Sequence, residues 1–122
     1  MLYHCEIGFP DSVKLPVGRY KLKYSEHARI AAATDKHNPF ANLLKYHEVL
    51  DTEVAEVIEI EIRDGKLSKI LYRLPLTGSD SYDIILAVLP HCWVVKTVWL
   101  NHRYDKHRTL NRSKYAHPKQ TK

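Results

Sequence analysis

The feature that most constrains the fold is a strict alternation of apolar and charged side chains from Ile58 to Arg63, within residues 56–63. Successive side chains of a β-strand point to opposite faces, so this alternation predicts a strand with one buried face. The Asp64-Gly65 pair that follows is typical of a two-residue hairpin turn, which needs positive φ at both central positions. A return strand is therefore expected directly after it. The isoleucines expected to share the buried face are Ile58, Ile60 and Ile62.

Three further strands complete the predicted sheet. Residues 66–74 form the return strand, and residues 82–89 are almost continuously apolar, which predicts a central strand buried on both faces. Residues 92–100 form the last strand. There Trp93 and Trp99 are expected to share one face, either stacked on RNA bases or buried beneath helices. The strands expected to form an antiparallel meander are 54–63, 66–74, 82–89 and 92–100.

In the first half of the chain, the sequence pattern predicts helices. An alanine-rich helix is expected over residues 25–34, with Ser25 as its N-cap. A second helix is expected to begin at Asn38-Pro39 and to end near residues 47–50. Residues 1–19 show no period and are expected to be an irregular arm. The expected fold class is therefore α+β, with this arm and one or two helices packed on a four-stranded antiparallel sheet.

Length and composition indicate one soluble domain. A chain of 122 residues can bury a core without metal or disulfide staples, and no apolar run approaches the roughly 20 residues that cross a membrane. We expect a domain over residues 1–100 and a basic tail over residues 101–122 that belongs to the same functional unit. The chain start shows no signal peptide pattern, and two cysteines suit a reducing compartment. A cytoplasmic location is therefore expected.

Positive charge is concentrated at the C-terminus. Residues 101–122 hold seven Lys or Arg and one Asp, a net charge of +6, whereas the first 100 residues carry a net charge of −1. Together they account for the +5 of the whole chain. Such a segment is typical of proteins that bind a polyanion, and the expected partner is RNA, either mRNA or ribosome-associated. DNA and a solvated tail without a partner are the alternatives. Neither a membrane nor a small-molecule ligand is expected.

Several side chains suit RNA cleavage without a metal. The reaction needs a base for the 2′-hydroxyl proton, an acid for the leaving 5′-oxygen, and cations for the charge on the phosphorane. Histidine suits the first two roles because its ordinary pKa lies near neutrality, and arginine suits the third. The candidate acid–base residues are His27, His47 and His102. The candidates for RNA contact are Arg29, Arg103, Lys106, His107, Arg108, Arg112 and Tyr115.

The run Leu22-Lys23-Tyr24-Ser25-Glu26-His27 resembles the RegB family of phage mRNA endoribonucleases, in which Lys-Tyr-Ser-X-His opens a helix and supplies a catalytic histidine. That family has a second catalytic histidine about 20 residues on, which His47 matches in spacing. RegB is similar in fold to the RelE and YoeB toxins, and His27-Ala28-Arg29 resembles a helix start of BrnT-type nucleases. The resemblance implies a phage-encoded or toxin-like, metal-independent endoribonuclease without a cofactor, in which His27 acts with His47 or His102.

Each assignment has an alternative that needs no function. His27 suits a capping or surface role, His47 a helix face near the core, and His102 a basic surface. His91 is expected to be a turn residue, and Arg73 to form a cross-strand ion pair with glutamates of the neighbouring strand. No histidines and cysteines have the spacing of a structural zinc site, so no metal is expected. The competing hypotheses are a non-catalytic nucleic-acid-binding or regulatory protein that uses the same basic segment, and a protein-interaction module.

Overall fold

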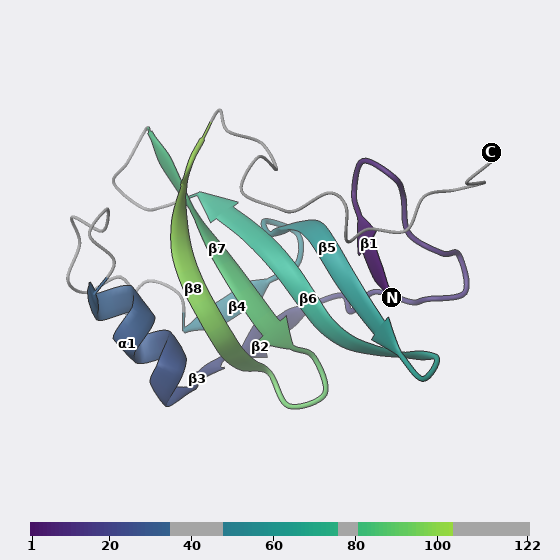
Figure 1. The fold of residues 1–122 in the computed structure, drawn as a ribbon, viewed down its shortest axis with the longest axis horizontal. Helices are drawn as coiled ribbons and strands as arrows, with labels where there is room; N and C mark the ends of the chain where they lie inside the picture. The colour runs from purple at the N-terminus through teal and green to yellow at the C-terminus, as the bar shows by residue number, and fades with distance from the viewer. Residues whose placement is uncertain (35–47, 76–80, 104–122) are drawn as a thin grey trace.

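The computed structural model describes residues 1–34, 48–75 and 81–103 and has a mostly β fold (Figure 1). Six strands form one sheet in the order β1-β5-β6-β7-β8-β3, and β2 and β4 form a separate two-stranded sheet. The helix α1 lies beside β8 (Figure 1). The elements are β1 (Leu2–His4), β2 (Arg19–Lys21), β3 (Lys23–Tyr24), α1 (Glu26–Thr34), β4 (Val49–Asp51), β5 (Glu56–Arg63), β6 (Lys66–Pro75), β7 (Tyr82–Leu89) and β8 (Val94–His102).

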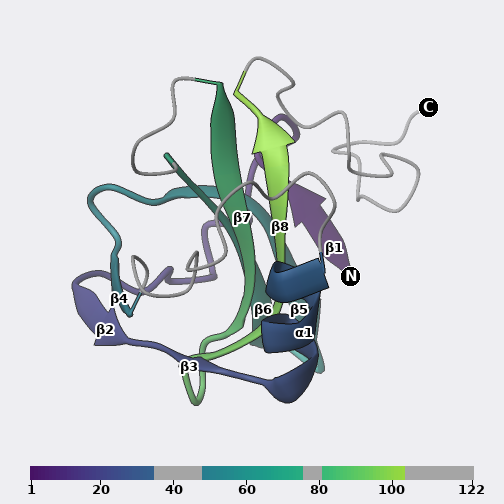
Figure 2. The ribbon, with the colours of Figure 1, turned by 90° about the vertical axis from the view of Figure 1, so that its left-hand side faces the viewer.

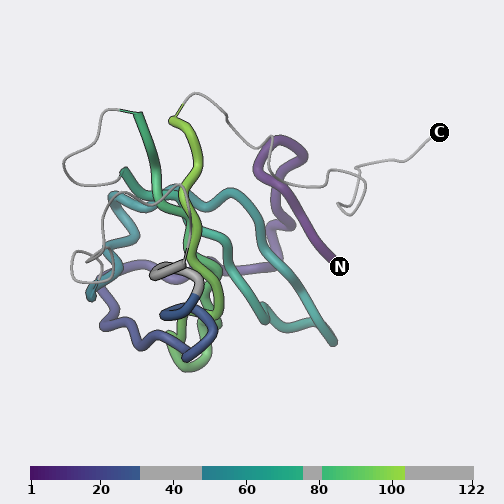
Figure 3. The backbone as a smooth tube through the Cα atoms, turned by 60° about the vertical axis from the view of Figure 1, so that its left-hand side comes forward, coloured from purple at the N-terminus to yellow at the C-terminus, as the bar shows by residue number. Residues whose placement is uncertain are grey.

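The predicted α+β class, with helices packed on a four-stranded antiparallel sheet, is wrong. The N-terminal residues expected to form only an irregular arm supply β1, which pairs antiparallel with β5 and extends the sheet. The segment before α1 supplies β3, which pairs parallel with β8 and makes the sheet mixed. Short N-terminal strands thus pair with β5 and β8 and satisfy part of their outer backbone groups. Figure 1 shows β1 and α1 at opposite sides of the molecule, and in Figure 3 the purple N-terminal segment lies on the right-hand side.

The second predicted helix lies mostly outside the described residues, and its expected end is a strand. Val49–Asp51 form β4, which pairs antiparallel with β2, so that Leu50 lies opposite Tyr20. Leu50 is fully buried against the large sheet, so this apolar side chain serves a strand rather than a helix face. Within the part of the chain that the structure describes, no helix is long and apolar enough to cross a membrane.

The predicted helix start, hairpin turn and four C-terminal strands are confirmed. Ala28 N donates a hydrogen bond to Ser25 Oγ at 3.1 Å, which is the N-cap interaction expected of Ser25. Asp64 and Gly65 have φ angles of 54° and 76°, as a primed turn between β5 and β6 requires. Strands β5 to β8 each begin and end within two residues of the predicted positions.

The core has two parts, one on each face of the large sheet. The main core lies between this sheet and the β2–β4 pair, which Figure 2 shows on one side of it. The second cluster, on the opposite face, consists of Ile58, Leu71, Ile85 and Ala87. The prediction that the three β5 isoleucines share one buried face is therefore wrong for Ile58. A register shift between Val57 and Glu59 turns Ile58 to the second cluster, while Ile60 and Ile62 stay with the main core.

The two tryptophans also lie on opposite faces, so the prediction that they share one is wrong. Trp93 precedes β8 with a φ angle of 55° and stacks on Tyr20, with ring centroids 3.9 Å apart, against the main core. Trp99 packs on the second cluster. The cause is a shift in the β7–β8 pairing, where β8 carries one extra residue, Lys96.

Candidate nucleic-acid interface

His27 and Arg29 lie near the start of α1, and both side chains are exposed. Ser25 fixes this start to the large sheet. Its backbone N donates to Val95 O at 3.0 Å, and its hydroxyl donates to Lys96 O at 3.3 Å. The first turn of a helix presents backbone N–H groups and a partial positive charge, which favour an anion. His27 is thus held in such a field, close to the first residues of β8.

His102 and Arg103 lie at the other end of β8. The His102 ring meets the Tyr82 ring edge-on, with centroids 5.8 Å apart. Arg103 Nε donates to Asp83 Oδ1 at 3.1 Å, and Arg103 Nη2 donates to the Tyr82 carbonyl at 3.1 Å. Its backbone N donates to Ser81 O at 2.8 Å. The predicted RNA-contact residue Arg103 is therefore oriented by the first two residues of β7.

A second arginine shares the same carboxylate. Arg73 Nη1 donates to Asp83 Oδ2 at 3.0 Å, and both residues are buried. The cross-strand ion pair expected of Arg73 therefore exists, but its partner is on β7 and not a glutamate of β5. Because Asp83 carries one negative charge and the two guanidinium groups carry two positive charges, these three residues leave one positive charge in excess.

The two described acid–base candidates do not converge. The pairing of Tyr24 with Val95 places the start of α1 beside the beginning of β8, whereas His102 is the last residue of that strand. Val95 pairs with Val88 and His102 with Tyr82, six positions away along β7, which at roughly 3.3 Å per residue is about 20 Å. His27 and His102 are therefore too far apart to act on one phosphate. The candidates that lie outside the described residues are His47, Lys106, His107, Arg108, Arg112 and Tyr115.

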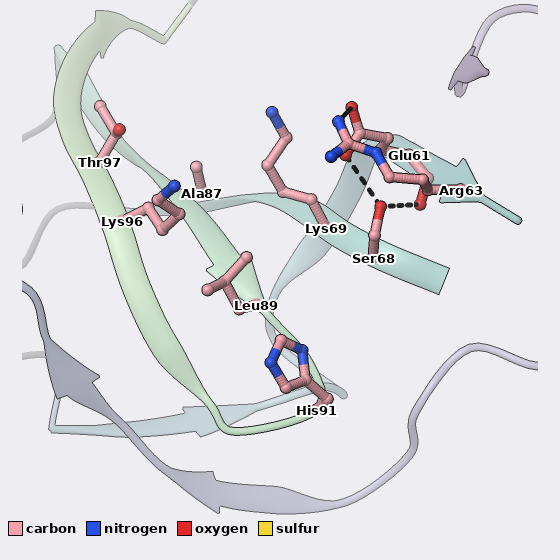
Figure 4. Close-up of a pocket in the computed structure, with 9 residues that line it drawn as sticks. All are labelled: Glu61, Arg63, Ser68, Lys69, Ala87, Leu89, His91, Lys96 and Thr97. Atoms are coloured by element: carbon pink, nitrogen blue, oxygen red, sulfur yellow. Dashed lines mark hydrogen bonds and ion pairs between the residues drawn. The ribbon is translucent and has the colours of Figure 1, made fainter. Parts of the chain in front are cut away.

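A groove that the sequence pattern does not predict lies on the face of the sheet that bears the second cluster. Its volume is about 410 Å³. Lys69 of β6, Lys96 of β8 and His91 of the β7–β8 turn surround it, with Ala87 and Leu89 between them (Figure 4). His91 is thus a turn residue, as predicted, but one that also lines this groove. Alternation places Lys69 on this face, whereas the position of Lys96 depends on a register shift that has no local sequence signal.

Glu61 supplies the carboxylate in the groove wall. Residues of its own hairpin, β5–β6, contact this carboxylate. Ser68 Oγ lies 2.8 Å from Glu61 Oε1 and donates to it, and Arg63 Nη2 lies 3.4 Å from Glu61 Oε2. The Ser68 hydrogen bond, followed by the charges of Lys69 and Arg63, holds the pKa of Glu61 below its ordinary value. This carboxylate is therefore ionised near neutral pH, and much of its hydrogen-bonding capacity is taken within the hairpin.

Comparisons with known proteins found no match, so the chemistry of this region is inferred from its own residues. Among the residues that the structure describes, no three His, Cys, Asp or Glu side chains lie close enough together to hold a metal ion. No family model matches the sequence, no curated protein matches it, and no solved structure matches the fold.

Proposed function

We propose that this protein binds RNA, with its basic C-terminal segment supplying much of the attraction. The observation that carries the proposal is the separation of charge along the chain: residues 101–122 carry a net +6, and the rest of the chain carries −1. Lysine and arginine side chains that neutralise phosphates release counterions, which makes such binding favourable and salt-dependent. A nearly neutral body with one strongly basic segment suits a polyanion better than a small ligand.

The geometry at the end of β8 supports the same proposal. The basic segment begins where Arg103 is held by Asp83 and Tyr82. Arg73 takes the other oxygen of Asp83, so two guanidinium groups share one carboxylate at this point. A guanidinium group already fixed by a carboxylate loses little freedom when it meets a phosphate. Arg103 would therefore add an ordered contact to those of the segment that follows it.

A salt titration tests this proposal. Binding of a fluorescent single-stranded RNA is measured by anisotropy at several salt concentrations, for the whole chain and for a chain that ends at residue 108. The truncation removes Arg112, Lys114, Lys119 and Lys122, so affinity should fall and the dependence of log K on log salt should flatten by up to about 2.8, at roughly 0.7 per phosphate contact. Absence of RNA binding by the whole chain, or an unchanged slope after truncation, would contradict it.

A second candidate function is metal-independent endoribonuclease activity. The observation that favours it is the exposed His27 in the first turn of α1, where the field of the helix favours a phosphate. We assign the partner role to His47 rather than to His102, because His102 lies at the far end of β8. Cleavage by 2′-hydroxyl attack would proceed in EDTA and leave 2′,3′-cyclic phosphate ends.

The two candidate functions are separated by one variant. His27→Ala should lower the cleavage rate by about 10²- to 10⁴-fold while leaving RNA affinity nearly unchanged, since a general acid or base acts mainly in the transition state. Glu26→Gln, directly before His27 and also exposed, is the matched control for a change at this helix start. If the wild type binds RNA but does not cleave it, the RNA-binding function stands and the endoribonuclease function is excluded.

A further inference from the structure

We propose that the groove lined by Lys69, Lys96 and His91 binds a phosphate group of the RNA backbone. The inference rests on the proposed RNA-binding function and adds a second contact region to it. Lys69 projects from β6 and Lys96 from β8 on either side of the groove, and His91 lies at its end (Figure 4). The side chains of Lys96 and His91 are exposed, so a ligand can approach from solvent.

Two irregularities in strand pairing build this groove. Between β7 and β8, Ala87 pairs with Thr97 and Val88 with Val95, which leaves Lys96 as an extra residue. Such a bulge interrupts the alternation of faces, so Lys96 and Thr97 both line the groove. Bulges cost regular pairing and are frequent beside functional sites, where they redirect a side chain. The position of Lys96 thus depends on this local departure from a regular strand.

The second irregularity places Ser68 against the carboxylate of Glu61, which would otherwise be available to neutralise the lysines. Between β5 and β6, Glu61 pairs with Lys69 and Ile62 with Leu67, which leaves Ser68 as the extra residue. Its hydroxyl contacts both the main-chain oxygen of Glu61, at 3.1 Å, and the carboxylate of Glu61. Arg63 takes the other carboxylate oxygen. Glu61 is therefore turned toward its own hairpin.

The ammonium groups of the groove have charge available for a ligand. Within the described ranges, the side-chain ammonium groups of Lys69 and Lys96 form no hydrogen bond and no ion pair. Lys69 contributes to the lowered pKa of Glu61, but as a smaller cause than the Ser68 hydrogen bond. Two positive charges that face one hollow repel each other, and a shared anion would offset that repulsion. Lysine binds phosphate as a point charge, without the planar geometry that a carboxylate pair requires.

The position of the groove favours a chain phosphate over a free one. Lys96 O accepts the hydroxyl hydrogen bond of Ser25, so the start of α1, where His27 is exposed, lies beside Lys96 at the β8 edge of the sheet. A phosphodiester chain that leaves the groove on this side would run past another region that favours anions. A free phosphate would use the lysines alone.

The test compares lysines inside and outside the groove. Lys69→Gln/Lys96→Gln removes two predicted contacts, and Lys66→Gln removes an exposed lysine of the same hairpin that does not line the groove. RNA anisotropy over a range of salt concentrations should show a slope smaller by about 1.4 for the double variant, at roughly 0.7 per single-strand phosphate contact. The slope of Lys66→Gln should stay close to that of the wild type. Thermal unfolding followed by circular dichroism confirms that each variant is folded.

The outcomes distinguish the two proposals and the two sources of phosphate. If the wild type binds RNA but the double variant keeps the slope of Lys66→Gln, the groove is not a contact region and only the RNA-binding proposal stands. If the wild type binds no RNA, the proposed function itself fails. Inorganic phosphate is titrated in parallel, with NMR shifts of the Lys69 and Lys96 amides as the signal. Shifts with inorganic phosphate but an unchanged RNA slope would mean that the groove binds free phosphate, which overturns the assignment to RNA.

Discussion

At the scale of single residues, Glu61 is the group whose ionisation the fold favours most clearly. Its pKa lies below the ordinary 4.5, chiefly because Ser68 donates a hydrogen bond to it. A carboxyl with a lowered pKa in the folded state stabilises the fold above pH 4.5 and loses that contribution as pH falls through its folded pKa. We therefore expect Ser68→Ala to lower stability near neutral pH and to reduce the further loss on acidification.

Urea unfolding at about pH 7 and about pH 3 measures this effect. The difference in unfolding free energy between the two conditions should be smaller for Ser68→Ala than for the wild type. Ser12→Ala, at an exposed position, is the control and should retain the wild-type difference. An equal acid dependence in Ser68→Ala and the wild type would show that the hydrogen bond does not set the ionisation of Glu61.

Asp83 is the residue whose loss should destabilise the fold most. It is buried, and both Arg73 and Arg103 donate to its carboxylate. Removing one partner of a buried ion pair leaves an uncompensated charge, which costs about 3–5 kcal/mol. We expect Asp83→Ala to lower the unfolding free energy by an amount in this range, as measured by urea titration. Asp64→Ala, at the exposed hairpin turn, removes the same charge from an unburied site and should cost clearly less. Equal losses in the two variants would mean that the network contributes little.

At the scale of elements, the β5–β6 hairpin depends on its turn residues. Gly65 has a φ angle of 76°, and a Cβ atom placed on it would meet nothing within 4 Å. The cost of a side chain there is therefore conformational and not steric. Gly65→Ala should lower the unfolding free energy by about 1 kcal/mol, because this φ is unfavourable for residues with a Cβ. Gly65→Asn should cost less, since asparagine tolerates such angles. A cost in the opposite order, measured by thermal unfolding, would contradict this account.

Local chemistry explains which elements could be predicted from the sequence. The turn at Asp64-Gly65 and the cap at Ser25 depend on residues adjacent in the chain, and the structure confirms both. The strands β1 and β3 have only three and two residues, and they exist because β5 and β8 lie beside them. Strands this short have little pattern of their own to place them in a sheet, so the predicted sheet lacks both and the predicted fold class is wrong even where the later strands are right.

The same distinction separates the parts of the proposed RNA interface that the sequence predicts from those that it does not. Charge is additive along the chain, so the basic segment after residue 100 is visible in the sequence itself. Which lysines share a groove depends on register. The extra residues at Ser68 and Lys96 are decided by how neighbouring strands pack, and a shift of one position moves a side chain to the other face. Ile58 shows the same effect in the core, where it leaves the face of Ile60.

At the scale of the whole molecule, the large sheet holds two cationic regions apart. Lys96 lies near the beginning of β8, and Arg103 directly follows its last residue. The seven positions between them correspond to about 23 Å, at roughly 3.3 Å per residue. The two regions are also held by different partners, because Arg103 contacts the beginning of β7 and Lys96 extends from a bulge near the β7–β8 turn. RNA bound to both would span the length of the strand.

This separation predicts that the two regions contribute independently to RNA affinity. Sites more than about 10 Å apart without shared partners usually have additive effects, within roughly 0.5 kcal/mol. The binding free energy lost in Lys96→Gln/Arg103→Gln should therefore equal the sum of the losses in the two single variants, as measured by anisotropy at one fixed salt concentration. A double-mutant cycle of Lys96→Gln and Lys69→Gln serves as the comparison. Its combined loss of binding free energy should differ from the sum of the single losses, because both lysines face one groove. Strong coupling between Lys96 and Arg103 would instead mean that one phosphate or one RNA bend connects the two ends, and that they do not act as separate contact regions.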